Sequence, residues 1–142
     1  MGVYYTDMAF DTDIPSHAPP VREIPHYHGD ALRAIFVVEA AILIVGAAMV
    51  VSLPLSTAGA VLAAIVLVVA AGVTNPAQEW IHYVNGVLAV LGTFTFGVRA
   101  VDTYRAGIDL SFVFVLALAL MSLVALYLAT RTIRGMILRP QY

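Results

Sequence analysis

The sequence predicts an all-α integral membrane protein folded as an antiparallel four-helix transmembrane bundle, with both termini in the cytoplasm. Hydrophobic residues make up 61% of the 142 residues and charged residues only 11%, whereas soluble domains are about half apolar and about a quarter charged. The apolar residues gather in four segments, and most arginines fall on one side of them. A chain of this composition needs lipid as its solvent.

The composition also excludes several classes of site and partner. The chain has no cysteine, so disulfides and thiolate-held zinc or iron–sulfur centres are excluded. A formal net charge of -2 provides no basic surface for nucleic acid. Nucleophile elbows, zinc-protease helices, phosphate loops and dinucleotide fingerprints are absent from the sequence. We therefore expect a non-enzyme that holds no cofactor and does not bind nucleic acid.

Residues 1–29 are expected to form a polar, acidic N-terminal tail. This segment carries aspartates and four prolines, instead of the basic start and early apolar run of a signal peptide. Its aromatic residues favour a tail that lies on the membrane surface or on a neighbouring subunit, and ordinary disorder is the alternative.

Four apolar segments are long enough, or nearly so, to cross a hydrocarbon core about 30 Å thick as helices rising about 1.5 Å per residue. The first covers residues 31–53 and is expected to end at Pro54. The second, 57–73, is short but consists almost entirely of Ala, Val, Leu and Ile. The third covers 76–100 and the fourth covers 110–130.

Local signals predict how some of these helices begin and end. Asp30 is placed to cap the first helix. Gly72 is expected to end the second helix, and Asn75 to cap the third. Pro76 would then fill the first turn of the third helix, and Gln78 would complete a capping box.

An even number of spans places both ends of the chain on one side of the membrane. That side carries five of the seven arginines, so the positive-inside rule predicts cytoplasmic termini. The opposite side carries Arg99 and Arg105. Four arginines next to the spans are expected to orient the helices and attract lipid headgroups: Arg33, Arg131, Arg134 and Arg139. The last three lie in or next to residues 132–142, which are expected to form a basic C-terminal tail.

Three segments carry a family resemblance: HGDALRAIF (28–36), GVTNPAQEW (72–80) and LYLATRTIRGM (126–136). With them, residues 26–137 resemble a family of small, uncharacterised four-span bacterial membrane proteins. The resemblance implies the four-span layout. It implies no activity and no functional residues.

Glu39 is the ionisable residue placed well inside the first span. An ionised carboxylate at the centre of a bilayer costs about 2.5 to 3.5 kcal/mol on insertion scales, so this side chain must be neutral, paired, or facing protein or water. One interpretation is an ion or proton site formed with Asn85 and Thr93 of the third span. The alternative is a hydrogen-bonding anchor between helices.

A metal site is a further hypothesis. Glu79 and His82 are spaced i, i+3, which places them on one helix face as in the Glu-x-x-His element of carboxylate-bridged metal bundles. A homodimer would supply two copies of this element together with two Glu39 carboxylates. His26 and His28 are additional candidate ligands, or pH-sensing groups. The alternative is that the spacing arises by chance and the histidines are ordinary interfacial residues.

Small or hydrogen-bonding residues recur every four positions along the third span: Asn85, Ala89, Thr93 and Gly97. Such stripes let helix backbones approach closely, so this one predicts a packing seam, especially at its last three positions. A pore lined by Asn85 and Thr93 is the alternative, and it would require several subunits around an axis.

These observations predict a multi-pass protein of the inner cell membrane whose partners are the lipid bilayer and other membrane subunits. The first function hypothesis is a non-catalytic structural or accessory subunit, as a homo-oligomer or as part of a larger complex. An oligomeric ion channel or small transporter that uses Glu39 is the alternative. A carboxylate and histidine metal-binding protein is the third.

Overall fold

The computed structural model describes residues 28–49, 52–75 and 77–138. Their regular secondary structure is entirely α-helical, which confirms the predicted all-α class with four helices. The helices are α1 (Gly29–Ala48), α2 (Thr57–Val73), α3 (Glu79–Ala106) and α4 (Leu110–Ile137). Most of the predicted N-terminal tail and the last four residues of the C-terminal tail lie outside the described residues.

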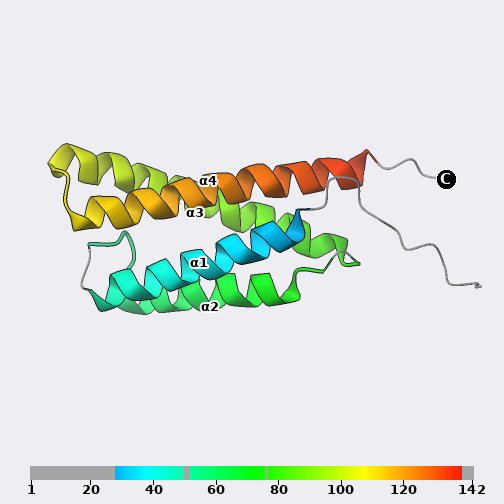
Figure 1. Cartoon of the computed structure of the whole chain (residues 1–142), viewed down its shortest axis with the longest axis horizontal. Helices are drawn as coiled ribbons and strands as arrows, with labels where there is room; N and C mark the ends of the chain where they lie inside the picture. The colour runs from blue at the N-terminus through cyan, green and yellow to red at the C-terminus, as the bar shows by residue number, and fades with distance from the viewer. Residues whose placement is uncertain (1–27, 50–51, 76, 139–142) are drawn as a thin grey trace, which may run out of the picture.

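The four helices lie side by side along the long axis of the molecule (Figure 1). The pair α3 and α4 packs most extensively, α1 packs on both α2 and α4, and α2 contacts α3 only sparsely. The backbone N–H of His28 donates to Thr132 Oγ1 over 3.3 Å, so the start of α1 lies beside the last turns of α4. The bundle is therefore closed tightly on three sides and loosely between α2 and α3.

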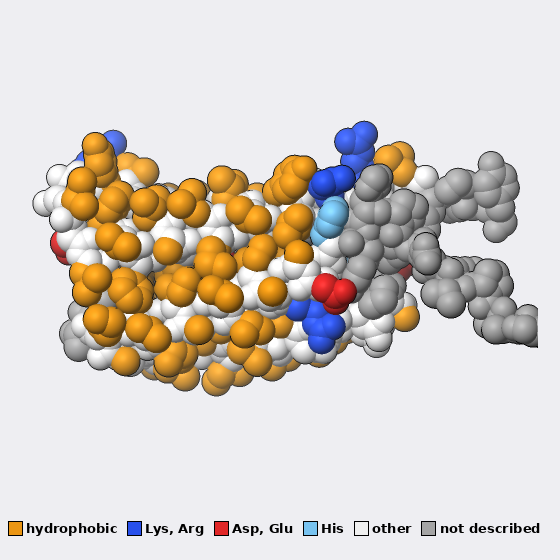
Figure 2. All heavy atoms as spheres, in the orientation of Figure 1, with side chains coloured by type: hydrophobic (Ala, Val, Ile, Leu, Met, Phe, Trp, Pro, Cys, Tyr) orange, Lys and Arg blue, Asp and Glu red, His pale blue; other side chains and the backbone are white. Residues whose placement is uncertain are grey.

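Small side chains fill much of the core, and large ones cover the outside. Buried alanines such as Ala64, Ala89 and Ala125 belong to two apolar clusters between the helices. Leu62 and Phe94, by contrast, expose 63% and 73% of their surface. Figure 2 shows hydrophobic side chains along the whole length of the visible face, with charged groups near its two ends. This distribution suits a protein surrounded by lipid.

Three of the helices, α1, α3 and α4, are long and apolar enough to cross a membrane. The apolar helix α2 is shorter, with 17 residues, which corresponds to about 26 Å at a rise of about 1.5 Å per residue. A core about 30 Å thick is slightly longer than that. The structure thus supports a membrane protein with three clear candidate spans and a fourth, shorter helix packed on α1.

The first helix is shorter than predicted. It ends at Ala48 instead of residue 53, so Pro54 is not what stops it. The side chain of Leu53 folds back to within 3.5 Å of the position that a Cβ on Gly46 would occupy. Ser52 accepts a hydrogen bond from Arg99 Nη2 at 2.7 Å, which anchors the connection to α3.

The third and fourth helices are longer than predicted at their C-terminal ends. The third begins at Glu79 instead of residue 76 and continues to Ala106 instead of residue 100, where Gly107 ends it with a φ of 138°. The fourth continues to Ile137 instead of residue 130. Both differences have the same cause. Polar residues end the apolar run that fits in lipid, but they do not end the helix.

Two predicted helix caps are wrong. His28, not Asp30, is the N-cap of α1, and Asp30 instead pairs with Arg33 over 3.6 Å on the surface. Asn75 Oδ1 accepts from Ala77 N at 2.9 Å, which caps a turn that precedes the helix.

The remaining predictions for this connection also need revision. Gln78 is the N-cap of α3 without a side-chain hydrogen bond, so no capping box forms. Gly72 lies within α2, which ends at Val73 with Thr74 as its C-cap. Pro76 lies outside the described residues.

Candidate functional site

Glu39 is buried in the contact between α1 and α4. It exposes 3% of its surface, and its Oε1 accepts a hydrogen bond of 2.8 Å from Ser122 Oγ. Ser122 comes from α4 and is itself buried. The partner of the carboxyl group therefore lies on another helix, since the neighbours of Glu39 on α1 are apolar.

Gly92 brings α3 close to this contact. A Cβ built on Gly92 would lie 2.6 Å from Ser122 Oγ and 3.1 Å from Ser122 Cβ. A side chain at this position would therefore collide with the residue that holds Glu39. Glu39, Gly92 and Ser122 form a junction of α1, α3 and α4, which we call the Glu39 junction. Gly92 lies outside the four-residue stripe of small residues on α3, so that pattern does not identify it.

A groove opens from the Glu39 junction toward the loosely closed side of the bundle. It has a volume of about 390 Å³, and α2 and α3 provide most of its walls. We call it the Glu39 groove. Its lining is apolar apart from Glu39, Ser122 and Thr95; the other lining residues are Leu43, Leu55, Gly59, Leu62, Ala63, Val66, Leu67, Leu88, Leu91, Gly92 and Phe96.

Glu39 has no ion-pair partner in the part of the chain that the structure describes. The one ion pair found there joins Asp30 to Arg33 on the surface. Ser122 supplies a single neutral hydrogen bond to one carboxyl oxygen. Because a charged group within the membrane normally pairs or faces water, this carboxyl group needs a proton or a further partner to offset its charge.

Asn85 is buried elsewhere, at the junction of α3 with the end of α2. Its Nδ2 donates to Thr74 Oγ1 at 2.9 Å, and Thr74 Oγ1 in turn donates to the carbonyl of Ala70 at 2.7 Å. Asn85 Oδ1 is buried without a hydrogen-bond partner among the described residues. This amide therefore fixes the connection between two helices.

The structure does not bring the predicted ion site together. Neither Asn85 nor Thr93 lines the Glu39 groove. Thr93 Oγ1 donates to the carbonyl of Ala89 on its own helix at 2.7 Å. Of the three predicted residues, only Glu39 faces this groove.

The predicted metal ligands do not gather into one site in the described part of the subunit. Residues 28–49, 52–75 and 77–138 contain no group of three or more His, Asp or Glu side chains that could hold a metal ion. Glu79 is exposed, whereas His82 is buried and interacts with the backbone of Asn75. His28 is partly buried, and His26 lies outside the described residues. A metal site shared between two subunits stays a prediction.

The predicted packing stripe divides into two parts. Ala89 is buried in the core together with Asn85. Thr93 and Gly97 instead line a shallow surface groove on α3, and nothing lies within 4 Å of a Cβ built on Gly97. The close approach of α3 inside the subunit thus occurs at Gly92, and a packing role for Gly97 stays a prediction.

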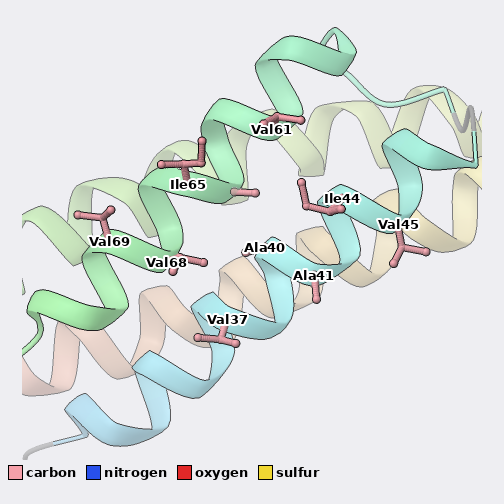
Figure 3. A pocket seen from close by; sticks show the side chains of 10 residues that line it. Val37, Ala40, Ala41, Ile44, Val45, Val61, Ile65, Val68 and Val69 are labelled. Atoms are coloured by element: carbon pink, nitrogen blue, oxygen red, sulfur yellow. The ribbon is translucent and has the colours of Figure 1, made fainter.

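A second apolar groove is lined by residues of α1 and α2 (Figure 3). Its volume of about 570 Å³ exceeds that of the Glu39 groove. Every residue that lines it is an alanine, valine or isoleucine: Val37, Ala40, Ala41, Ile44, Val45, Val61, Ala64, Ile65, Val68 and Val69. This α1–α2 groove therefore offers no group that could bind an ion or a polar atom.

The predicted headgroup-binding arginines lie on the surface where they are described. Arg33 pairs with Asp30, and Arg131 lies over the ring of Tyr127, 5.8 Å from its centroid. Arg134 is exposed in the last turn of α4. Arg139 lies outside the described residues. These positions leave the guanidinium groups accessible to headgroups at one end of the bundle.

Comparison with known protein families, with curated proteins and with solved structures finds no match for this chain. The resemblance to small four-span bacterial membrane proteins therefore stays a prediction.

Proposed function

We propose that this protein is a non-catalytic structural or accessory subunit of the inner cell membrane. In this proposal all four helices cross the membrane as an antiparallel bundle, and both termini lie in the cytoplasm. The subunit forms a homo-oligomer or joins a larger membrane complex. The arginines at the end that holds both termini then follow the positive-inside rule.

The observation that carries the proposal is the hydrogen bond between Glu39 and Ser122. Within lipid, polar side chains that bond to one another across helices stabilise the assembly of a bundle. Glu39 is buried and bonded to another helix of the same chain, as expected of an anchor. Asn85 and Thr74 form a second bond of this kind. Both contacts favour a protein whose polar residues hold its helices together.

The Glu39 anchor is tested by two substitutions in the full chain. Glu39→Gln keeps an oxygen that accepts from Ser122, whereas Glu39→Leu removes it. The accessory role predicts that only Glu39→Leu lowers stability in detergent, by about 1 kcal/mol. It also predicts that liposomes with wild-type protein pass protons and cations no faster than empty liposomes. Faster flux that Glu39→Gln abolishes would contradict the accessory role and favour transport.

The topology is tested with single cysteines, because the natural chain has none. Ile108, between α3 and α4, and Leu138, after α4, are 75% and 66% exposed. We expect a membrane-impermeant maleimide to label Ile108→Cys on intact spheroplasts, and Leu138→Cys only after permeabilisation. Labelling of both cysteines on intact spheroplasts would contradict the proposed arrangement.

The outward face of α3 supports the proposed oligomer. Thr93 and Gly97 lie one helical turn apart in an open apolar groove, and small residues at this spacing let two membrane helices approach closely. Gly97→Val should therefore reduce the oligomer measured by native mass spectrometry in nanodiscs while the monomer stays folded. An unchanged oligomer would place the subunit interface elsewhere.

Transport is the second candidate function, and the Glu39 groove favours it. The carboxyl group that anchors α1 to α4 also contributes to the lining of a groove at the loosely closed side of the bundle. An ionisable group next to a cavity within the membrane is typical of ion and proton pathways. The flux measurement on Glu39→Gln separates this candidate from the accessory role.

A further inference from the structure

We infer that the Glu39 groove is a binding site for a hydrophobic organic cation, whose charged centre pairs with the Glu39 carboxylate. Three properties of the groove support this ligand class: its uncompensated carboxyl group, its apolar walls and its opening between α2 and α3.

The carboxyl group supplies the charge complementarity. Ser122 bonds only to Oε1, and no arginine among the described residues forms an ion pair with Glu39. Burying a carboxylate without a counter-charge is costly, so a proton or a cation must offset its charge. A bound cation would replace the proton and gain a charge-assisted contact in a medium of low dielectric constant.

The walls of the groove select the rest of the ligand. Ligand pockets of about 300 to 1,000 Å³ with apolar linings and a few convergent polar groups are typical of small-molecule sites. The Glu39 groove, at about 390 Å³, falls within this range. Leu62, Val66 and Leu91 give it walls from both α2 and α3. A small hydrated metal ion would leave these walls uncovered, whereas aromatic or alkyl groups would cover them.

The opening of the groove provides a path from the membrane. The two helices that form its walls contact each other sparsely, and their neighbouring outward residues are large and apolar. Hydrophobic cations concentrate in membranes, so they reach such an opening from the lipid side. The α1–α2 groove has a larger volume, but it lies between two helices that pack closely and its lining contains no carboxyl group. It therefore serves as an internal comparison.

This inference goes beyond the accessory role and does not require that the bound cation be moved across the membrane. Binding without flux would fit an accessory subunit whose assembly is sensitive to a ligand. Binding with flux would fit a transporter.

The experiment measures equilibrium binding of radiolabelled tetraphenylphosphonium to the purified full chain in nanodiscs. Tetraphenylborate, an anion of the same shape, is the matched probe. We expect saturable binding of the cation and none of the anion. Glu39→Gln should weaken cation binding by about tenfold or more, since it removes the paired charge, whereas Glu39→Asp should retain most of it.

Two matched variants test the location of the site. Ala63→Phe places a ring in the Glu39 groove, and Ala41→Phe places the same ring in the α1–α2 groove. We expect only Ala63→Phe to abolish binding. This pair keeps the test decisive if Glu39→Gln does not fold. Equal binding of both ions, undiminished binding by Glu39→Gln or Ala63→Phe, or no saturable binding by the wild type would each overturn the inference.

Discussion

Two buried polar contacts hold this bundle together, and they differ in what surrounds them. At one, Ser122 donates to Glu39 over 2.8 Å; at the other, Asn85 donates to Thr74 over 2.9 Å. All four side chains are at most 3% exposed. By distance and burial alone, the two contacts are equivalent anchors between segments of the chain.

The surroundings of the two contacts differ. The hydroxyl group of Thr74 is also bonded to the end of α2, so the Asn85 contact is part of a continuous connection from α2 to α3. The Glu39 contact joins helices that are remote in sequence and contributes to the lining of a groove. An amide adds no charge, whereas a carboxyl group can gain or lose a proton. Burial alone therefore does not distinguish a side chain that anchors two helices from one that binds a ligand. The distinction depends on whether a groove adjoins the side chain and on whether the side chain can carry a charge.

The largest expected effect comes from crowding the Glu39 junction. Gly92→Val should destabilise the protein by about 3 kcal/mol, because overpacking a filled contact forces neighbouring groups apart. The position of a Cβ at Gly92, 2.6 Å from Ser122 Oγ, is the physical reason. Reversible unfolding in mixed SDS micelles measures this change. Gly97→Val is the matched control, and equal losses of monomer stability in the two variants would refute the close approach at Gly92.

A smaller loss is expected from removing the hydroxyl group that bonds to Glu39. Ser122→Ala should cost about 1 kcal/mol, because it leaves a buried acceptor without its donor. Thr130→Ala, which removes an exposed hydroxyl group from the same helix, serves as the matched control. The same unfolding assay applies, and a stability within error of the wild type for Ser122→Ala would show that this bond does not anchor α1 to α4.

The Asn85 contact should be worth less than the Glu39 contact. A double-mutant cycle with Asn85→Leu and Thr74→Val should give a coupling energy of about 0.6 kcal/mol, the average for hydrogen bonds between membrane helices. None of these variants should change binding of tetraphenylphosphonium, since neither residue lines the Glu39 groove. Loss of cation binding in Asn85→Leu would contradict the inference that only the Glu39 contact belongs to a binding site.

The smallest effect is expected at Thr93. Its hydroxyl group bonds to the carbonyl of Ala89 on its own helix, so Thr93→Val should change stability by less than about 0.5 kcal/mol, as is usual away from buried contacts. Ion flux in liposomes should also stay at the wild-type level. A change in ion flux specific to Thr93→Val would indicate that Thr93 contributes to an ion pathway.

The sequence was sufficient to predict the class of fold and the four apolar segments, because hydropathy and length determine them. It was less informative about helix ends. Helices α3 and α4 continue past the apolar runs at Arg99 and Thr130, since a helix that leaves lipid can continue in polar surroundings. Leu53 continues the apolar run of the predicted first helix, but its side chain folds back toward Gly46.

The candidate site was predictable only in part. Glu39 stands out because charges are rare within an apolar segment. Its partner Ser122 is 83 positions away in sequence, and no periodicity along one helix identifies it. The choice between Gly92 and Gly97 likewise depends on how α3 is rotated against α4, which a stripe of small residues does not determine.

We propose that the Glu39 carboxyl group is both bonded to Ser122 and accessible through the Glu39 groove. This proposal is tested by labelling the full chain in nanodiscs with a hydrophobic carbodiimide, which reacts with carboxyl groups from the lipid side, followed by peptide mass spectrometry. We predict an adduct on Glu39 that Ala63→Phe suppresses and Ala41→Phe does not. An unmodified Glu39, or labelling that is equal in both variants, would contradict the claim.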